Sequence, residues 1–289
     1  MTADSSILKS IQPKEKDLGE FKVRRSVPQV GTKSIGPWVF FDHFGPAEFE
    51  PGEGINVRPH PHINLATVSY LFEGEIFHRD SLGNAMSIHP GAVNLMVAGK
   101  GIVHSERTRD ELKQTGYKLH GLQLWHALPE EYEEIEPAFY HTAAEDIPQG
   151  EKAGVVYRVI MGEAYGLKSP VKTYSPILYV EADMPAGTEL LLPQAEERGV
   201  YVVKGEAEVD NIESPIFTMS VLSPQAKKIK AITDVRFAII GGTPLGKRFM
   251  DWNFVSSRQA RITQAKEDWR KGRFDKVPGD EDEFIPLPK

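Results

Sequence analysis

Histidine is confined to one part of this chain. All nine histidines lie between residues 43 and 141, and none follows in the rest of the sequence. Four side chains in that window form two pairs with the same spacing, His60 with His62 and His104 with Glu106. The chain has no cysteine, so a bound metal ion would take its ligands from His, Asp and Glu. The distribution predicts one metal centre in the first half of the chain and another role for the second half.

The i, i+2 spacing of both pairs suits a β-strand. Alternate residues of a strand point to one face, so His60 and His62 can direct both imidazoles to one point while Pro61 faces away. A proline there limits sheet pairing and indicates an edge or irregular strand. His104 and Glu106 on a neighbouring strand would complete a set of three imidazoles and one carboxylate. An octahedral ion held by four such ligands keeps two positions open for water, dioxygen or a bidentate organic ligand.

Other interpretations of these residues remain open. A single His-x-His pair also fits an exposed strand or two ordinary core histidines. The second pair and the glycine turn at residues 98–101 favour the metal centre. His43, beside Asp42, is either an outer partner of the site or a structural histidine. The remaining histidines lack paired spacing, and we expect structural or exposed roles for His78, His89, His120, His126 and His141.

Short apolar and β-branched runs must supply the strands that carry these pairs. They are separated by turn signals such as Ser81–Asn84 and His89–Gly91, which is typical of an antiparallel sandwich or barrel. We therefore expect an all-β fold. The predicted strands are residues 38–41, 66–72, 92–97, 119–125, 155–161, 177–180, 200–203 and 236–240.

One segment near the end has helical periodicity instead. Between Ser257 and Gly272, the apolar residues Ile262, Ala265 and Trp269 recur at helical spacing. The serine is placed to cap the start of the helix and the glycine to end it. The pattern predicts an amphipathic helix that docks by its Trp269 face.

The cations of this helix allow two interpretations. They could form a nucleic-acid-binding face, or they could be a solvated helix surface. Glu267 and Asp268 interrupt the run and favour the solvated surface. The residues concerned are Arg258, Arg261, Lys266, Arg270, Lys271 and Arg273.

A connector rich in Glu, Pro and Ala separates two halves. We expect an N-terminal metal-binding domain at residues 1–130, a connector at 131–150 and a metal-free domain with the helix at 151–289. The halves share a faint repeat, in which residues 70–75 and 201–206 each read as a strand, a glycine turn and a return strand.

The repeat has an offset of 131 residues if Gly74 is matched with Gly205. At this offset His60 and His62 project onto Leu191 and Pro193. The second half therefore lacks the histidine ligands of the first.

Composition narrows the function classes. The 289 residues are enough for two domains, with 40% hydrophobic residues to fill their cores. A net charge of -7 argues against general attraction to nucleic acid or anionic membranes. No stretch approaches the about 20 apolar residues that span a bilayer, and residues 1–11 lack the apolar core of a secretory signal. We expect a soluble, cytoplasmic protein without a membrane partner.

Several long motifs resemble the pirin family of the cupin superfamily. The first is Arg58-Pro-His60-Pro-His62-Ile-Asn-Leu-Ala-Thr67-Val-Ser-Tyr70-Leu-Phe-Glu-Gly74. The second follows Pro90-Gly91 and reads Met96-Val-Ala-Gly-Lys-Gly101-Ile-Val-His104-Ser-Glu106. Flanking motifs at residues 40–45 and 241–245, together with the terminal helix, extend the resemblance over nearly the whole chain.

The resemblance implies a bicupin, in which two cupin-type β-barrels are followed by a short C-terminal helix. It implies one divalent metal ion, Fe(II), in the N-terminal barrel only. Many cupins place a glutamate ligand shortly after the His-x-His pair, whereas this chain has Leu65, Ala66 and Thr67 there. Glu106 would then be the single carboxylate ligand. The implied ligand set is His60, His62, His104 and Glu106.

Two functions from different classes follow from the resemblance. The first is a dioxygenase that cleaves flavonols such as quercetin, with Glu106 as the candidate general base. The second is a regulatory module, such as a transcription cofactor or enzyme regulator, whose surface responds to the metal or its redox state and meets a protein partner. The charged helix and the acidic connector are the features that would favour the second. Because both barrels lie in one chain, we expect a monomer.

Overall fold

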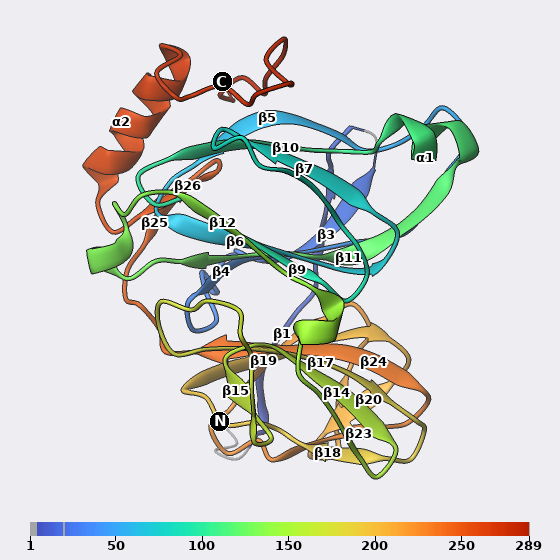
Figure 1. Cartoon of the computed structure of the whole chain (residues 1–289). Helices are drawn as coiled ribbons and strands as arrows, with labels where there is room; N and C mark the ends of the chain where they lie inside the picture. Colours follow the sequence, from blue (N-terminus) through green and yellow to red (C-terminus); the bar gives the residue numbers. More distant parts are fainter. Residues whose placement is uncertain (1–4, 20, 289) are drawn as a thin grey trace. The chain divides into compact units, whose positions relative to one another are not determined.

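The structure is a computed structural model that describes residues 5–19 and 21–288, and strands make up most of it. The described residues form two compact units. One combines Arg24–Phe40 and Glu145–Pro244 with the described part of Met1–Lys14. The other combines Phe41–Ala144 with the described parts of Glu15–Val23 and Leu245–Lys289. Figure 1 shows a β-barrel in each unit, which confirms the all-β fold.

The barrel that carries the histidine pairs is built from two antiparallel sheets. The larger has the strand order β12-β9-β6-β11-β4-β3-β2, and the smaller has the order β5-β10-β7-β8. The strands are β2 (Lys14–Asp17), β3 (Lys22–Val27), β4 (Trp38–Phe49), β5 (Asn56–His62), β6 (Leu65–Glu73), β7 (Ile76–Asp80), β8 (Ala85–Ile88), β9 (Val93–Val97), β10 (Ile102–Arg107), β11 (Tyr117–Ala127) and β12 (Ala138–Thr142). Two short strands near the chain end, β25 (Phe249–Asp251) and β26 (Phe254–Ser256), pair with each other.

The second barrel repeats this arrangement. Its larger sheet has the order β1-β22-β19-β24-β17-β14-β13 and its smaller sheet the order β18-β23-β20-β21. The strands are β1 (Ile7–Ile11), β13 (Gln149–Lys152), β14 (Val155–Met161), β17 (Ile177–Met184), β18 (Glu189–Leu191), β19 (Glu197–Lys204), β20 (Ala207–Val209), β21 (Ile212–Ser214), β22 (Met219–Leu222), β23 (Lys228–Ala231) and β24 (Val235–Gly242). A small hairpin of β15 (Glu163–Ala164) and β16 (Leu167–Lys168) is added.

The predicted hairpin repeat is confirmed as part of this repeat of whole barrels. Gly74 and Gly205 follow equivalent strands with φ of 91° and 82°. An added β-carbon would lie 2.2 Å from the carbonyl oxygen of Lys118 at Gly74, and 2.2 Å from that of Asp234 at Gly205. Both turns therefore need glycine for its backbone conformation and for close approach.

The projection of the histidine pair onto Leu191 and Pro193 is wrong by one residue. Leu191 is 62% exposed, whereas Leu190 and Leu192 are buried in the apolar core. The connection from β18 to β19 is longer than the one from β5 to β6. The offset of 131 residues, measured at the hairpin, therefore does not hold for residues before that connection. An error of one residue in a strand assigns each side chain to the wrong face.

The predicted terminal helix is present as α2 (Gln259–Arg270). Ile262 and Ala265 are fully buried, and Trp269 packs against the same cluster. Gly272 follows the helix with φ of 64°, as expected for a helix stop. The expected serine cap is wrong: Arg258 is the N-cap residue, and no side chain caps the helix. Ser257, the serine expected to cap the helix, donates its N–H and hydroxyl to Glu133 instead. Another helix, α1 (Asp110–Thr115), has no counterpart among the predictions.

Seven of the eight predicted strands lie within strands of the structure, and the one predicted at residues 92–97 begins one residue before β9. The expected connector, 131–150, also contributes regular structure, because β12 extends the larger sheet by pairing with β9. Short 3-10 turns at Glu130–Tyr132 and Ala144–Asp146 flank β12. In the described residues, neither α-helix has the length and apolar character needed to cross a bilayer.

Candidate metal centre

The strand that carries His60 and His62 is an edge strand with a bulge. β5 lies at one edge of its sheet and pairs with β10, with His60 opposite His104. The register then shifts, so that Glu106 lies opposite Val57 and Ser105 faces two residues of β5. The prolines in this strand suit an edge, because they have no N–H to donate. Bulges of this kind redirect side chains next to functional sites.

The structure brings three histidines together on the inner face of these two strands. His60, His62 and His104 each offer a ring nitrogen, and these nitrogens all lie within 4.8 Å of one another. The ring centroids of His60 and His104 are 4.3 Å apart, and His62 lies 5.1 Å from each of the other two rings. Trp125 packs edge-on against His62 at 4.8 Å. This group, which we call the histidine triad, is the one candidate metal cluster in the described part of the chain.

Backbone carbonyls orient two rings of the triad. His60 Nδ1 lies 2.9 Å from the Arg58 carbonyl oxygen, which the bulge turns toward the ring. His62 Nδ1 lies 3.1 Å from the Asn253 carbonyl oxygen. A neutral imidazole whose Nδ1–H donates to a carbonyl presents the lone pair of Nε2. These contacts favour the tautomer that leaves Nε2 of both rings available to a metal ion.

The buried nitrogen atoms of the triad fit a metal ion. Within the described residues, His62 Nε2 and both ring nitrogens of His104 are buried without a hydrogen-bond partner. Buried polar atoms without partners are rare and unfavourable. A divalent ion of the kind that imidazole binds would satisfy them.

Burial also keeps the triad in its metal-binding protonation state. Loss of solvation lowers the pKa of His60 to about 4. It lowers the pKa of His62 and His104 well below the usual value of a histidine, and the neighbouring imidazoles lower both further. The three rings are therefore neutral at pH 7, as ligation requires.

Glu106 lies on the same strand face, but it is outside the group whose ligand atoms lie within 4.8 Å. Burial raises the pKa of its carboxyl, and this exceeds the opposing effects of His78 and of a hydrogen bond with Ser69. The Ser69 hydroxyl donates its one hydrogen to Gln123 Oε1 at 2.7 Å. The carboxyl thus lies near the polar side chains of Ser69 and His78 and retains a proton more readily than an exposed glutamate.

The sequence interpretation missed His78. It lies on β7 opposite Glu106, and its ring centroid is 5.3 Å from that of His104. Its Nε2 atom lies 3.1 Å from Oδ2 of the fully buried Asp80, and Phe139 stacks on its ring. The spacing of His78 and Asp80 is also i, i+2, so the signal was present in the sequence.

The other histidines have different surroundings. Nε2 of His43, the candidate outer partner, lies 2.8 Å from Nε2 of His120. His141 Nδ1 lies 2.7 Å from Asn94 Oδ1. His89 is exposed, and its Nδ1 lies 3.7 Å from Glu75.

Comparison with known proteins identifies the family. The family model described as Pirin matches residues 20–126, and the model described as Pirin C-terminal cupin domain matches residues 179–275. The chain belongs to the pirin family. This pirin is 46% identical to a pirin-like protein of Caulobacter vibrioides over 281 residues, which cover 96% of this chain and 97% of the relative. It is 31% identical to human pirin, with 87% of each chain covered.

A solved structure extends the comparison to the fold. Quercetin 2,3-dioxygenase from Acinetobacter baumannii superimposes on this pirin with a TM-score of 0.90 and 32% identity. The match covers 98% of this chain and 95% of the other. The bicupin fold implied by the motifs is therefore confirmed, and both barrels have counterparts in an enzyme of known structure.

Proposed function

We propose that this pirin binds one Fe(II) ion through the histidine triad and Glu106, and that it is a dioxygenase of the quercetin 2,3-dioxygenase type. The observation that carries the proposal is the convergence of three buried imidazoles, in which His62 Nε2 and both nitrogens of His104 lack partners. The likeness to the Acinetobacter enzyme over nearly the whole chain supports a flavonol as the substrate class.

Three residues around the triad, Glu106, Ser69 and Trp125, would have separate roles in such a reaction. Bound Fe(II) would acidify a chelating flavonol hydroxyl and bring dioxygen next to it. Glu106 would accept the proton of that hydroxyl as it swings partly off the metal, and its raised pKa suits a group that takes up a proton. Ser69 would then accept a hydrogen bond from the protonated carboxyl while it donates to Gln123. Trp125, packed on His62, would help to keep water from the centre.

The regulatory alternative receives little support, because the charges that favoured it are largely paired within one unit. Glu134 accepts from Arg258 and Arg261 at 2.6 and 3.0 Å. The buried Glu133 accepts from the Ser257 backbone and hydroxyl at 2.7 and 2.9 Å. Lys266, Lys271 and Arg273 pair with Asp251, Glu267 and Asp268. Cations paired in this way are poorly placed to recognise nucleic acid or an acidic partner.

Turnover of quercetin under air tests the proposal. Full-length protein reconstituted with Fe(II) should consume quercetin and dioxygen, and His62→Ala and Glu106→Ala should each abolish turnover. His89→Ala is the matched control, because it removes an exposed imidazole outside the triad. Metal content is measured on each sample. Full turnover in both site variants, or no turnover in wild-type protein with one equivalent of iron, would contradict the proposal.

A further inference from the structure

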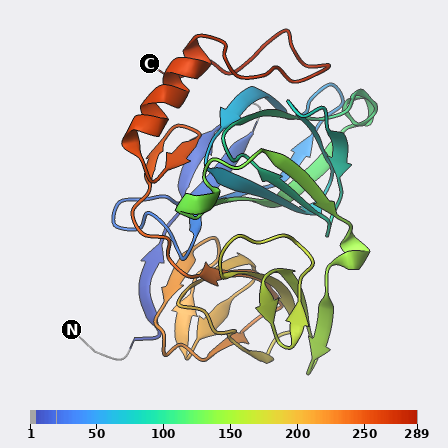
Figure 2. The ribbon, with the colours of Figure 1, turned by 60° about the vertical axis from the view of Figure 1, so that its left-hand side comes forward.

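The chain ends in a segment that returns to the strands of the metal centre. Residues 273–288, which we call the C-terminal strap, follow α2 without forming a helix or strand. Figures 1 and 2 show the strap running beside β5 and β10 on the outer side of their sheet. Val277 is its one fully buried apolar anchor, and Phe274 stacks on Phe254 at 6.2 Å. Its position therefore depends on a few specific contacts rather than on a ladder of backbone hydrogen bonds.

One of these contacts holds the bulge in β5. The Ile285 N–H donates to the Pro59 carbonyl oxygen at 2.9 Å. The Ile285 carbonyl in turn accepts from Trp269 Nε1 at 3.0 Å, which ties the strap to α2. Pro59 directly precedes His60, and the Arg58 carbonyl accepts from the ring of His60. Of the two carbonyls in the bulge, that of Arg58 thus accepts from the His60 ring and that of Pro59 accepts from the strap.

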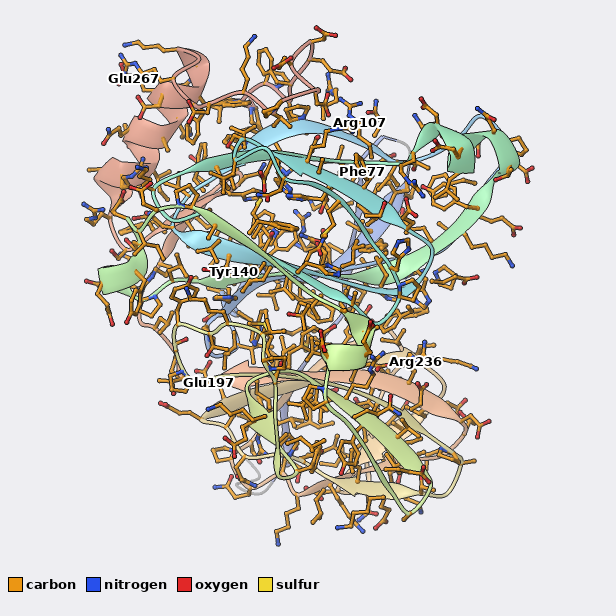
Figure 3. The ribbon with its side chains drawn as sticks, viewed as in Figure 1. Phe77, Arg107, Tyr140, Glu197, Arg236 and Glu267 are labelled. Atoms are coloured by element: carbon orange, nitrogen blue, oxygen red, sulfur yellow. The ribbon has the colours of Figure 1, made fainter. Side chains whose placement is uncertain are left out.

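A second contact is an ion pair on β10. Arg107 donates from Nε and Nη2 to the two carboxylate oxygens of Asp280, both at 2.6 Å, and from Nη2 to Glu283 at 2.9 Å. The side chains of Arg107 and Asp280 are only 19% and 9% exposed. A bidentate pair with so little exposure has defined geometry and is stronger than an ordinary surface pair. Figure 3 shows Arg107 on the side of the sheet that faces the strap.

The alternation of side chains makes these contacts relevant to the metal centre. In β10, Arg107 points outward to Asp280 and His104 points inward to the triad, so the alternation of a strand turns Glu106 inward as well. The strap therefore contacts β10 at Arg107, the residue after Glu106, and it contacts β5 at Pro59, the residue before His60.

We propose that the C-terminal strap is a positioning element of the metal centre, with Asp280 as its principal residue. Asp280 holds β10 from outside, and Ile285 holds the bulge of β5. Together they fix the distance at which Glu106 and His60 approach the same ion. Loss of the strap contacts would leave the ligand side chains unchanged. The strands that align these side chains would be held less firmly. The inference rests on the metal site proposed above and adds a part of the chain far from it in sequence.

Titration with Co(II) tests this role in the full-length protein after removal of metal by a chelator. Asp280→Asn should weaken Co(II) binding about tenfold and change the visible absorption of bound Co(II), because the ligand geometry is altered. Asp282→Asn is the matched control. It makes the same chemical change two residues away at an exposed position and should bind within about twofold of wild type. Binding is measured well below the thermal midpoint of each variant, so that a purely structural role would leave the affinity and the spectrum unchanged.

A milder variant keeps the test decisive if Asp280→Asn does not fold. Glu283→Gln removes the more exposed partner of Arg107 and should weaken Co(II) binding in the same direction by a smaller factor. If wild type binds one Co(II) and the folded strap variants bind with the same affinity and spectrum, the inference on the strap is overturned while the metal site stands. If wild type itself binds no Co(II), the metal site fails, and the strap inference falls with it.

Discussion

A row of three inward-facing residues crosses the smaller sheet of each barrel. In the barrel of the metal centre the row is His60, His104 and Asp80. In the second barrel it is Leu190, Ile229 and Val209. The strand orders of the two sheets are the same, so the backbone does not decide which barrel carries the candidate metal centre. Side-chain polarity at a few central positions decides it.

The two interiors also differ in what they require energetically. Leu190, Ile229 and Val209 join one large apolar cluster, which gains free energy by burial and close packing. In the first barrel an apolar cluster around Phe44 and Leu119 is accompanied by buried imidazoles and carboxyls. Such polar groups cost free energy unless they are paired or bind an ion. The second barrel thus stabilises the fold by apolar burial. The first barrel keeps the buried polar groups of the candidate site at a cost in free energy.

Substitution of the central residue in each row should separate these two roles most clearly. Ile229→Ala should lower the free energy of unfolding by about 2–5 kcal/mol, because it leaves a cavity in a packed core. In metal-free protein, His104→Ala should cost much less, because it removes a ring whose buried nitrogens have no partner. Urea denaturation followed by circular dichroism measures both. An equal loss in the two variants would contradict the division of roles.

Acid should destabilise the two barrels unequally. The pKa of His60 is lowered to about 4 in the folded protein, whereas a histidine in the unfolded chain has its usual pKa of 6.5. Below pH 6.5 the unfolded chain therefore binds a proton that the folded chain refuses, and stability is lost progressively as the pH falls toward 4. At pH 5 the loss for this group is about 2 kcal/mol relative to pH 7. The barrel of β18 and β23 contains no histidine and lacks this term.

Urea midpoints of metal-free protein at pH 7 and pH 5 measure this effect. His60→Leu should reduce the difference between the two midpoints. If that variant shows the wild-type dependence on pH, the buried imidazole is not the source of the acid sensitivity.

Replacement of His78, which lies opposite Glu106, should have a smaller effect and tests its influence on the Glu106 carboxyl. The positive form of His78 lowers the pKa of Glu106, against the stronger effect of burial. His78→Leu should therefore raise the pKa of Glu106 further. Since a protonated carboxyl cannot accept the substrate proton, the acidic limb of kcat/KM should move to higher pH. A pH profile of quercetin turnover measures the shift, and an unmoved limb would show that Glu106 is not the group that limits turnover in acid.

Local patterns in the sequence were enough for the strands, the glycine turns and the terminal helix. Period-two alternation placed His60 with His62 and His104 with Glu106 on shared faces, and it needed no tertiary information. The helical spacing of Ile262, Ala265 and Trp269 was likewise local. The strand order could not be predicted from local patterns, because the pairing of β5 with β10 joins residues about 40 positions apart, such as His60 and His104.

What the sequence determined by itself is the set of chemical groups and the face of the strand that each occupies. Alternation along a chain is a property of the extended backbone, so the two histidine pairs could be recognised without the fold. Only the tertiary structure decided which groups meet across strands. Register and the bulge in β5 bring His104 against His60, place His78 opposite Glu106 and leave that carboxyl just outside the triad. The strap contacts of Asp280 depend on the same long-range packing, which no local pattern encodes.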